Sequence, residues 1–190
     1  MLHVDFNPFP NLETERLVLR RINSDDAKAI LAIRSDDRVM QFIGRPKLNT
    51  IDEAKDLIEK IELSLLQQEG ISWCITKKQN HTLIGTIGFW RLLKEHYRAE
   101  IGYLLHPDFQ GQGIMHEAFA PVLKYGFEKM HLHSVEANVY PANFSSIKVL
   151  EKNGFIKEGY YKENYFFDGE FTDTAVYSLV MDNTEQVVKQ

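Results

Sequence analysis

The residues of this chain best suited to chemistry lie in one stretch, residues 106–118, which reads H-P-D-F-Q-G-Q-G-I-M-H-E-A. Gly111 and Gly113 allow the backbone to approach a ligand closely or to take a positive φ. The free N–H groups of a helix that begins here, and the positive end of its dipole, favour an anion such as a diphosphate. The stretch lacks the Gly-Lys-Ser/Thr of a P-loop and the G-x-G-x-x-G of a dinucleotide fold. It therefore predicts an anion cradle of another kind.

A second group of polar residues, Asn143-Phe144-Ser145-Ser146, follows later in the chain. Asn and Ser oxygens accept hydrogen bonds from the free N–H groups at a helix start, so these residues are first of all capping candidates. Gly111 and Gly113 of the first stretch, taken alone, are likewise compatible with a plain strand-to-helix turn. Each group alone leaves a purely structural interpretation open.

Hydrophobic periodicity predicts the elements that would position the two groups. Strands are expected over residues 12–22, 71–76, 83–93, 98–106, 134–140, 155–167 and 171–181. Helices are expected after a Ser24 cap, over residues 50–70, over residues 114–130 and over residues 143–153. The second to fourth strands are expected to form an antiparallel meander, and residues 38–49 a loop.

Several local signals mark where these elements begin and end. Thr50 and Glu53 make a capping box, Gly154 suits a left-handed helix end, and Asp168-Gly169 is a hairpin turn signal. Pro121 lies inside the predicted third helix, where it removes a backbone hydrogen bond and predicts a kink. With neither an internal repeat nor a linker, the chain is predicted to form one mixed α/β domain over residues 1–190.

The composition is that of an ordinary globular chain, with 190 residues, 44% hydrophobic and 26% charged. It has no apolar run of the roughly 18 residues that a membrane span needs and no export signal, so we expect a cytoplasmic protein. A net charge of −5 argues against a nucleic-acid partner. Cys74 lies in a strand-like run, where a small buried hydrophobe is expected rather than a nucleophile. His131 and His133 lack the spacing of metal ligands, so no metal is expected.

Both motifs and the order of elements resemble the GNAT acyltransferases. The family's cofactor motif, Q/R-x-x-G-x-G/A, corresponds to residues 110–115, with Met115 in place of the final small residue. Its later motif, N-x-x-S-x-x-x-x-E-K-x-G-F, corresponds to residues 143–155. The runs L-E-T-E-R-L-V-L-R and A-E-I-G-Y-L-L further resemble the RimJ/RimL branch of protein N-terminal acetyltransferases. The resemblance implies a mostly antiparallel twisted sheet of about seven strands, splayed between strands 4 and 5, with about four flanking helices.

The resemblance also implies a cofactor, acetyl-coenzyme A, held where the sheet is splayed. Its pantetheine arm would pair with the open strand edge at Leu104 and Leu105 and bond to Asn143. A backbone N–H near Leu105 would stabilise the thioester oxyanion. Its diphosphate would take N–H groups from the cradle, which comprises Gln110, Gly111, Gln112, Gly113, Ile114 and Met115.

For the chemistry, Glu100 is the first candidate for the base that removes a proton from the amine, acting through water. A solvated strand carboxylate is the alternative for Glu100, since period-2 alternation does not settle its face. Ser146 matches the serine thought to protonate the thiolate in the RimL branch, and a capping role is its alternative. Residues 163–165, where that branch carries a second carboxylate, keep the acid and base assignment open.

The expected activity is direct transfer of acetyl to a primary amine in a ternary complex, most simply the α-amine of a protein N-terminus. Tyr165, in an aromatic hairpin, is the candidate for contact with the acceptor. Two alternatives stay open: acetylation of a small amine such as a polyamine or an antibiotic, and a non-catalytic acetyl-coenzyme A binding module. A monomer and a homodimer are both compatible with the sequence.

Overall fold

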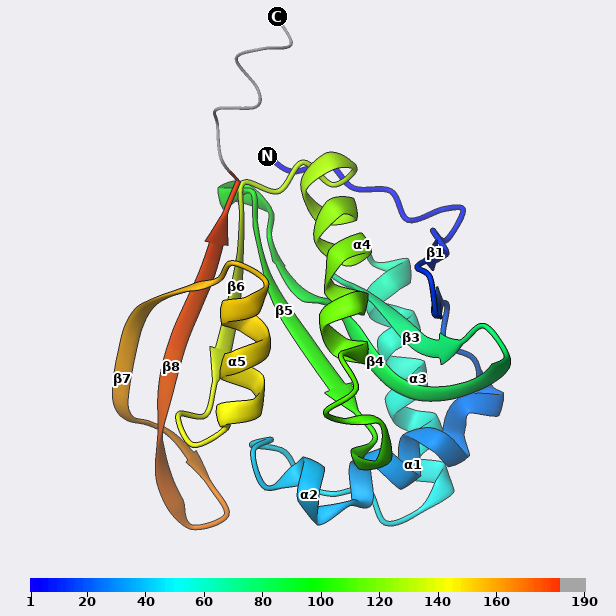
Figure 1. Cartoon of the computed structure of the whole chain (residues 1–190), viewed down its shortest axis with the longest axis horizontal. Helices are drawn as coiled ribbons and strands as arrows, with labels where there is room; N and C mark the ends of the chain where they lie inside the picture. The colour runs from blue at the N-terminus through cyan, green and yellow to red at the C-terminus, as the bar shows by residue number, and fades with distance from the viewer. Residues whose placement is uncertain (182–190) are drawn as a thin grey trace, which may run out of the picture.

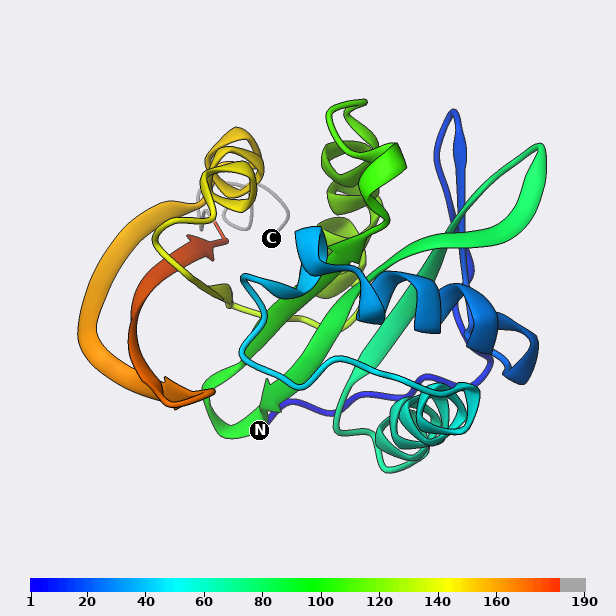
Figure 2. The same ribbon diagram turned by 90° about the horizontal axis from the view of Figure 1, so that it is seen from below.

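The computed structural model describes residues 1–181 and shows an eight-stranded twisted sheet with helices on both faces (Figures 1 and 2). The strands are β1 (Leu12–Glu13), β2 (Leu17–Arg20), β3 (Ile71–Lys77), β4 (Asn80–Leu93), β5 (Arg98–Leu105), β6 (Ser134–Val139), β7 (Ile156–Phe167) and β8 (Glu170–Val180). The helices are α1 (Ala27–Ser35), α2 (Asp37–Met40), α3 (Ile51–Leu66), α4 (Ile114–Glu128) and α5 (Phe144–Lys152). Short 3-10 turns are η1 (Ser24–Asp26), η2 (Lys94–His96) and η3 (Pro107–Phe109). The predicted mixed α/β class is confirmed.

The strand order is β1-β2-β3-β4-β5-β6-β8-β7, and every neighbouring pair is antiparallel except β5 and β6. That parallel pair is short, because its register ends where Glu100 meets Glu136. Beyond this point the two strands diverge, as the ribbon shows (Figure 1). The predicted splay is therefore confirmed, between β5 and β6. The predicted strands 4 and 5 are β5 and β6, because the first predicted strand forms two strands, β1 and β2.

The first correction concerns residues 12–22, which were predicted as one strand. β1 and β2 are separate and pair with each other, with Leu12 opposite Leu19. Thr14 turns the chain between them: its N–H donates to the Leu17 carbonyl (3.1 Å) and its Oγ1 accepts from the Leu17 N–H (2.9 Å). The alternation of apolar and polar residues does not reveal this turn, since β1 and β2 carry the same pattern.

Two further corrections concern the first helical region. The N-cap is Asn23 and not Ser24, because the Asn23 side chain accepts from Asp25 N and Asp26 bonds back to the Asn23 N–H. The predicted loop over residues 38–49 contains the end of the short helix α2, which Asp36 caps through the Arg38 N–H. A four-residue helix is too short to show apolar periodicity.

The two faces of the sheet carry different helices. α4 and α5 cover one face, and α3, with α1 packed beside it, lies on the other (Figure 2). The Thr50–Glu53 capping box that starts α3 is present as predicted. The apolar stripe of α4 buries Ala118, Phe119 and Val122 against the sheet, which fixes the helix start beside the diverging strands.

The last hairpin, β7 with β8, forms a wing at one side of the molecule (Figure 1). Asp168 (φ +51°) and Gly169 (φ +84°) make the predicted tight turn. Most side chains of β7 are exposed. Within residues 1–181, no helix combines the length and apolar character needed to cross a membrane. The predicted domain also included residues 182–190, which lie outside the described residues.

Candidate active site

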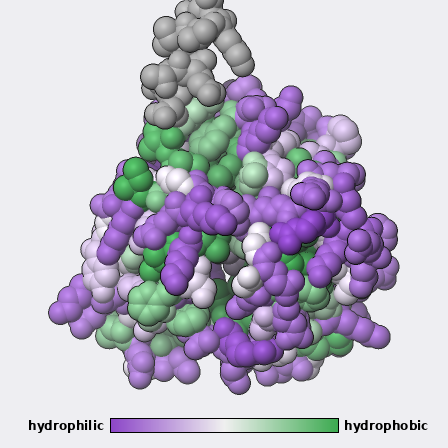
Figure 3. Space-filling view, in the orientation of Figure 1, coloured by the Kyte–Doolittle hydropathy of each residue, from purple (hydrophilic) through white to green (hydrophobic). Residues whose placement is uncertain are grey.

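A cavity of about 610 Å³ lies where β5 and β6 diverge, within the size range typical of small-molecule sites. Its walls come from β5, β6, α2, α5 and the start of α4. On the face in Figure 3, pale and green side chains reach the surface near the centre between purple flanks, where the ribbon places the gap between α4 and α5. The predicted site residues that line the cavity are Glu100, Leu104, Leu105, Gln110, Gly111, Gly113, Ile114, Met115, Asn143 and Ser146.

The glycine cradle forms one end of the cavity. Gly111 and Gly113 have φ of +71° and +73°, a left-handed conformation that glycine adopts without strain. A Cβ at Gly111 would meet no atom within 4 Å, so this backbone faces open space. α4 begins immediately afterwards at Ile114, and its first N–H groups lack intrahelical acceptors. The cradle therefore has the geometry and the dipole for an anion.

The cradle is held in place from behind by the β1–β2 turn. The Arg16 guanidinium donates to the Gln112 carbonyl (3.2 Å) and pairs with Glu117 in the first turn of α4 (2.5 Å). Thr14 Oγ1 donates to the same carboxylate (2.5 Å). These contacts join segments about a hundred residues apart, so periodicity alone does not reveal them. They tie the cradle and the first turn of α4 to the β1–β2 turn.

Cationic side chains stand near the cradle. Lys148 and Lys152 of α5 line the cavity, and neither forms an ion pair with another residue of the described part of the chain. His116 also lines it, with Nδ1 3.0 Å from Asn153 Oδ1. Unpaired ammonium groups beside a cradle of backbone N–H groups fit a ligand that carries phosphates.

Glu100 stands on the opposite side, at the point where β5 and β6 part. Its side chain is only 12% exposed, so it is not the solvated strand carboxylate that the sequence left open. Asn138 Nδ2 donates to Glu100 Oε1 (3.0 Å), and Arg91 Nη1 lies 3.7 Å from Oε2. Burial, reinforced by the nearby Glu136 carboxylate, raises the pKa of Glu100 despite the Asn138 hydrogen bond. A carboxylate with a raised pKa in a cavity is a candidate general base.

Asn143 and Ser146 have different roles at the start of α5. Asn143 is the N-cap: its Oδ1 accepts from the Ser146 N–H (3.1 Å). The Ser146 hydroxyl takes no part in capping, and its Oγ lies 2.5 Å from the phenol oxygen of Tyr103. The hydroxyl therefore faces β5 across the divergence.

Two predicted site residues do not line the cavity. Gln112 turns outward, where its Nε2 donates to the Asp108 carbonyl (2.8 Å). Tyr165 lies on the β7 wing, and its hydroxyl donates to the Gly44 carbonyl (2.6 Å), joining the wing to the segment after α2. A contact of Tyr165 with an acceptor stays a prediction.

The structure also adds a residue that the sequence did not suggest. β4 carries a bulge at Trp90, because Phe89 pairs with Ile101 whereas Arg91 already pairs with Glu100. The bulge turns Trp90 toward the cavity, where its ring lies on Gly102 and the residue is 47% exposed. A single extra residue in a strand leaves no mark in an alternating pattern, so no signal in the sequence identifies Trp90.

Cys74 is fully buried between β3 and the α1–α3 layer and does not line the cavity. Burial, with the nearby Asp26 carboxylate, raises the pKa of its thiol, so the reactive thiolate is absent near neutral pH. Cys74→Ala should keep turnover within about two-fold, because a direct transfer needs no enzyme nucleophile. Intact-mass spectrometry with acetyl-coenzyme A checks this. An acetylated protein, or a folded but inactive variant, would contradict it.

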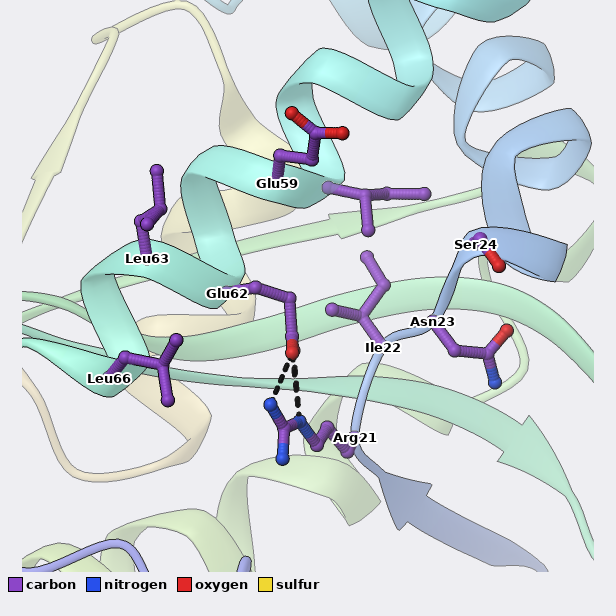
Figure 4. Close-up of a pocket in the computed structure, with 9 residues that line it drawn as sticks. Arg21, Ile22, Asn23, Ser24, Glu59, Glu62, Leu63 and Leu66 are labelled. Carbon is purple, nitrogen blue, oxygen red and sulfur yellow. Dashed lines mark hydrogen bonds and ion pairs between the residues drawn. The ribbon is translucent and has the colours of Figure 1, made fainter.

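A second cavity lies on the other side of the sheet, between the β2–η1 connection and α3 (Figure 4). Its two facing charges, Arg21 and Glu62, are already paired, with Nε 3.0 Å from Oε1. Its remaining walls include Leu63 and Leu66. None of its lining residues is a glycine, so it lacks a backbone cradle like that of the first cavity. Among residues 1–181 no three His, Cys, Asp or Glu side chains are grouped to hold a metal ion.

Comparison with known proteins agrees with this geometry. The family model described as an acetyltransferase (GNAT) domain matches residues 16–156. A Bacillus subtilis protein named as the uncharacterized N-acetyltransferase YoaA is 39% identical over 172 residues, 90% of this chain and 97% of that protein. The [Ribosomal protein uS5]-alanine N-acetyltransferase of Escherichia coli is 27% identical over 180 residues, covering 90% and 91%.

Among solved structures, a GNAT-family acetyltransferase from Bacillus anthracis superposes with a TM-score of 0.80 at 29% identity, covering 90% of this chain and 98% of that one. The family match thus includes β2 to β6, the cradle and α5. With the family match spanning most of the chain and the cavity placed at the splayed strands, the chain belongs to the GNAT acetyltransferase family.

Proposed function

We propose that this protein transfers acetyl from acetyl-coenzyme A to the α-amine of a protein N-terminus by direct attack in a ternary complex. The observation that carries the proposal is a single cavity with an anion cradle at one end and the mostly buried carboxylate of Glu100 at the other. A thioester held from the cradle and an amine held near Glu100 would meet between them. The proposal is supported by the relative named for ribosomal protein uS5.

The donor would lie along the divergence of β5 and β6. The cradle would hold its diphosphate, with Lys148 and Lys152 nearby to balance phosphate charge. Beyond Glu100, β5 has no strand partner on its β6 side, so its edge at Leu104 and Leu105 suits the pantetheine amides. Asn143 Nδ2 has no hydrogen-bond partner among residues 1–181 and suits the same arm.

Glu100 would take the proton that the amine loses, directly or through water. Its raised pKa brings it closer to that of the amine, which improves a general base near neutral pH. An α-amine, with a pKa of about 7.7–8.0, is also far easier to neutralise than a lysine at about 10.4. Ser146 would donate a proton to the departing sulfur.

The charge of the cavity favours a single amine over a polyamine. Glu100 is the one carboxylate in its wall within residues 1–181, whereas Arg38, Lys148 and Lys152 are cationic. A polyamine would bring several ammonium groups to a wall that offers a single carboxylate to pair with them. Trp90, Phe42 and Tyr140 give the acceptor side apolar walls suited to a short side chain.

A free-thiol assay with a panel of acceptors tests the proposal. The panel contains an alanine-initiated and a serine-initiated hexapeptide, the same peptides with blocked N-termini and an internal lysine, spermidine, and an aminoglycoside. Thiol release is expected only with the free N-termini. Release with spermidine or the aminoglycoside alone would favour the small-amine alternative. No release with any amine, together with thermal stabilisation by acetyl-coenzyme A, would favour a binding module.

A further inference from the structure

Tyr103 of β5 is a partly buried titratable residue that the mechanism above does not use. It lies on the same strand face as Ala99 and Ile101, and its ring packs edge-on against Phe119 of α4 (centroids 4.9 Å apart). Its hydroxyl reaches across the divergence of the strands to α5, where Oη lies 2.5 Å from Ser146 Oγ. Both residues line the cavity. The two hydroxyls therefore meet where the thioester is proposed to lie.

The direction of this hydrogen bond follows from the two groups. A phenol is a stronger acid than an aliphatic hydroxyl, so Tyr103 is the better donor and Ser146 Oγ the acceptor. The competing acceptor, the Ser146 carbonyl, is 3.4 Å from Oη, too long for a strong bond. Because the Ser146 oxygen accepts from the phenol, the Ser146 O–H remains available to donate to a third group in the cavity.

Burial raises the pKa of Tyr103. The phenol is therefore protonated near neutral pH and can donate its hydrogen to Ser146 Oγ. A donor at 2.5 Å also stabilises negative charge that develops on the Ser146 oxygen when that oxygen gives up its proton.

We propose that Tyr103 is a positioning residue that aims the Ser146 hydroxyl at the sulfur of the thioester. This inference rests on the proposed function, and specifically on Ser146 as proton donor. The amine nitrogen bonds to the acetyl carbon, the carbon–sulfur bond breaks with its electron pair on sulfur, and sulfur takes the Ser146 proton. Water then reprotonates Ser146, and the proton lost by nitrogen leaves through Glu100, so one proton passes in sum from amine to thiol.

The test compares Tyr103→Phe, Ser146→Ala and the double variant, with Tyr125→Phe as a matched control. Phenylalanine keeps the ring contact with Phe119 and removes only the hydroxyl. Tyr125 is another partly buried tyrosine, packed on Trp73 (centroids 5.4 Å apart), and it does not line the cavity. Hydroxylamine serves as acceptor, because it is small and neutral near pH 7 and reaches the thioester whatever the natural acceptor is. Thiol release without protein is subtracted.

Tyr103→Phe is expected to lower kcat about 10-fold with KM for acetyl-coenzyme A unchanged, the loss of one hydrogen bond to a developing charge. Ser146→Ala should lower kcat further, and the double variant should equal Ser146→Ala, because Tyr103 acts only through the serine. Tyr125→Phe should stay within about two-fold of the parent protein.

Three results would overturn the inference alone: a normal kcat for Tyr103→Phe beside an impaired Ser146→Ala, defects that multiply in the double variant, or a Tyr103→Phe defect confined to KM. A normal kcat for Ser146→Ala would instead remove the serine from the proposed mechanism and the inference with it. An absence of protein-dependent thiol release would overturn both. Melting temperatures of all four variants show whether each is folded.

Discussion

Glu100→Gln is expected to lower turnover about 100-fold or more near neutral pH while keeping the fold and the affinity for acetyl-coenzyme A. Glutamine has the same shape and keeps an oxygen that can accept from Asn138 Nδ2, which lies 3.0 Å from Glu100 Oε1 in the parent protein. It has no basic oxygen to take the amine proton. The measurement is kcat across about pH 6–9 with an α-amine peptide and with a lysine side-chain acceptor.

The pH dependence of this defect has a definite sign. As pH rises, more of the acceptor arrives already neutral, so the difference between parent and variant should shrink. It should also be smaller for the α-amine than for lysine, whose pKa is higher. In the parent protein, kcat should fall on the acid side as Glu100 is protonated, at a pH above that of an ordinary glutamate, because its pKa is raised.

Stability provides an independent check on the same residue. A carboxyl group whose pKa is raised by folding contributes stability below its unfolded pKa, and loses this contribution as pH rises through its folded pKa. Near neutral pH the ionised Glu100 is therefore not a stabilising group, and Glu100→Gln should unfold at the same temperature as the parent or higher. If unfolding caused the loss of activity, Glu100→Gln would instead unfold at a lower temperature than the parent protein.

Glu136→Gln is the matched control, since Glu136 lies opposite Glu100 in the parallel register but does not line the cavity. Its charge contributes to the raised pKa of Glu100, so the control should retain turnover and move the acid limb to lower pH. Normal turnover of Glu100→Gln from about pH 6 to 9 would make Glu100 structural, and would direct the search for a base to Glu163 and Tyr165 or to bulk water.

Gly113→Val is expected to abolish the thermal stabilisation that acetyl-coenzyme A gives the parent protein. A ligand at about 100 times its Kd stabilises the folded state by about 2.7 kcal/mol. For a chain of this size that free energy corresponds to a rise of roughly 5–10 °C in Tm. Valine is strained at φ +73°, and its Cβ would lie 3.7 Å from Arg16 Nη2, so the substitution should displace the backbone donors that we propose for the diphosphate.

Gly169→Val is the control variant for the effect of backbone strain alone. Gly169 also has a positive φ (+84°) and would meet no atom within 4 Å, but it lies in the β7–β8 turn, away from the cavity. Both variants should melt at lower temperature than the parent, because valine is strained at a positive φ. Only Gly113→Val should lose the ligand-induced rise. A folded Gly113→Val protein with the full rise would show that the cradle does not bind the donor.

The local elements of this fold were predictable because short-range chemistry specifies them. The capping box at Thr50, the left-handed end at Gly154 and the turn at Asp168-Gly169 each depend on residues within a few positions, and the structure contains all three. The same holds for the glycine cradle. By contrast, the turn at Thr14 and the short helix α2 were missed, since their patterns are too short to differ from those of a strand or a loop.

The chain's own sequence thus determined the family, the mixed α/β class and most residues of the candidate site, because glycines, caps and periodic apolar positions act locally. Only the tertiary structure decided that Glu100 is shielded from water, that Ser146 meets Tyr103 rather than capping its helix, and that Trp90 faces the cavity. These properties depend on where β5 and β6 part and on one bulge in β4. Both are consequences of register between strands distant in sequence, which no local pattern encodes.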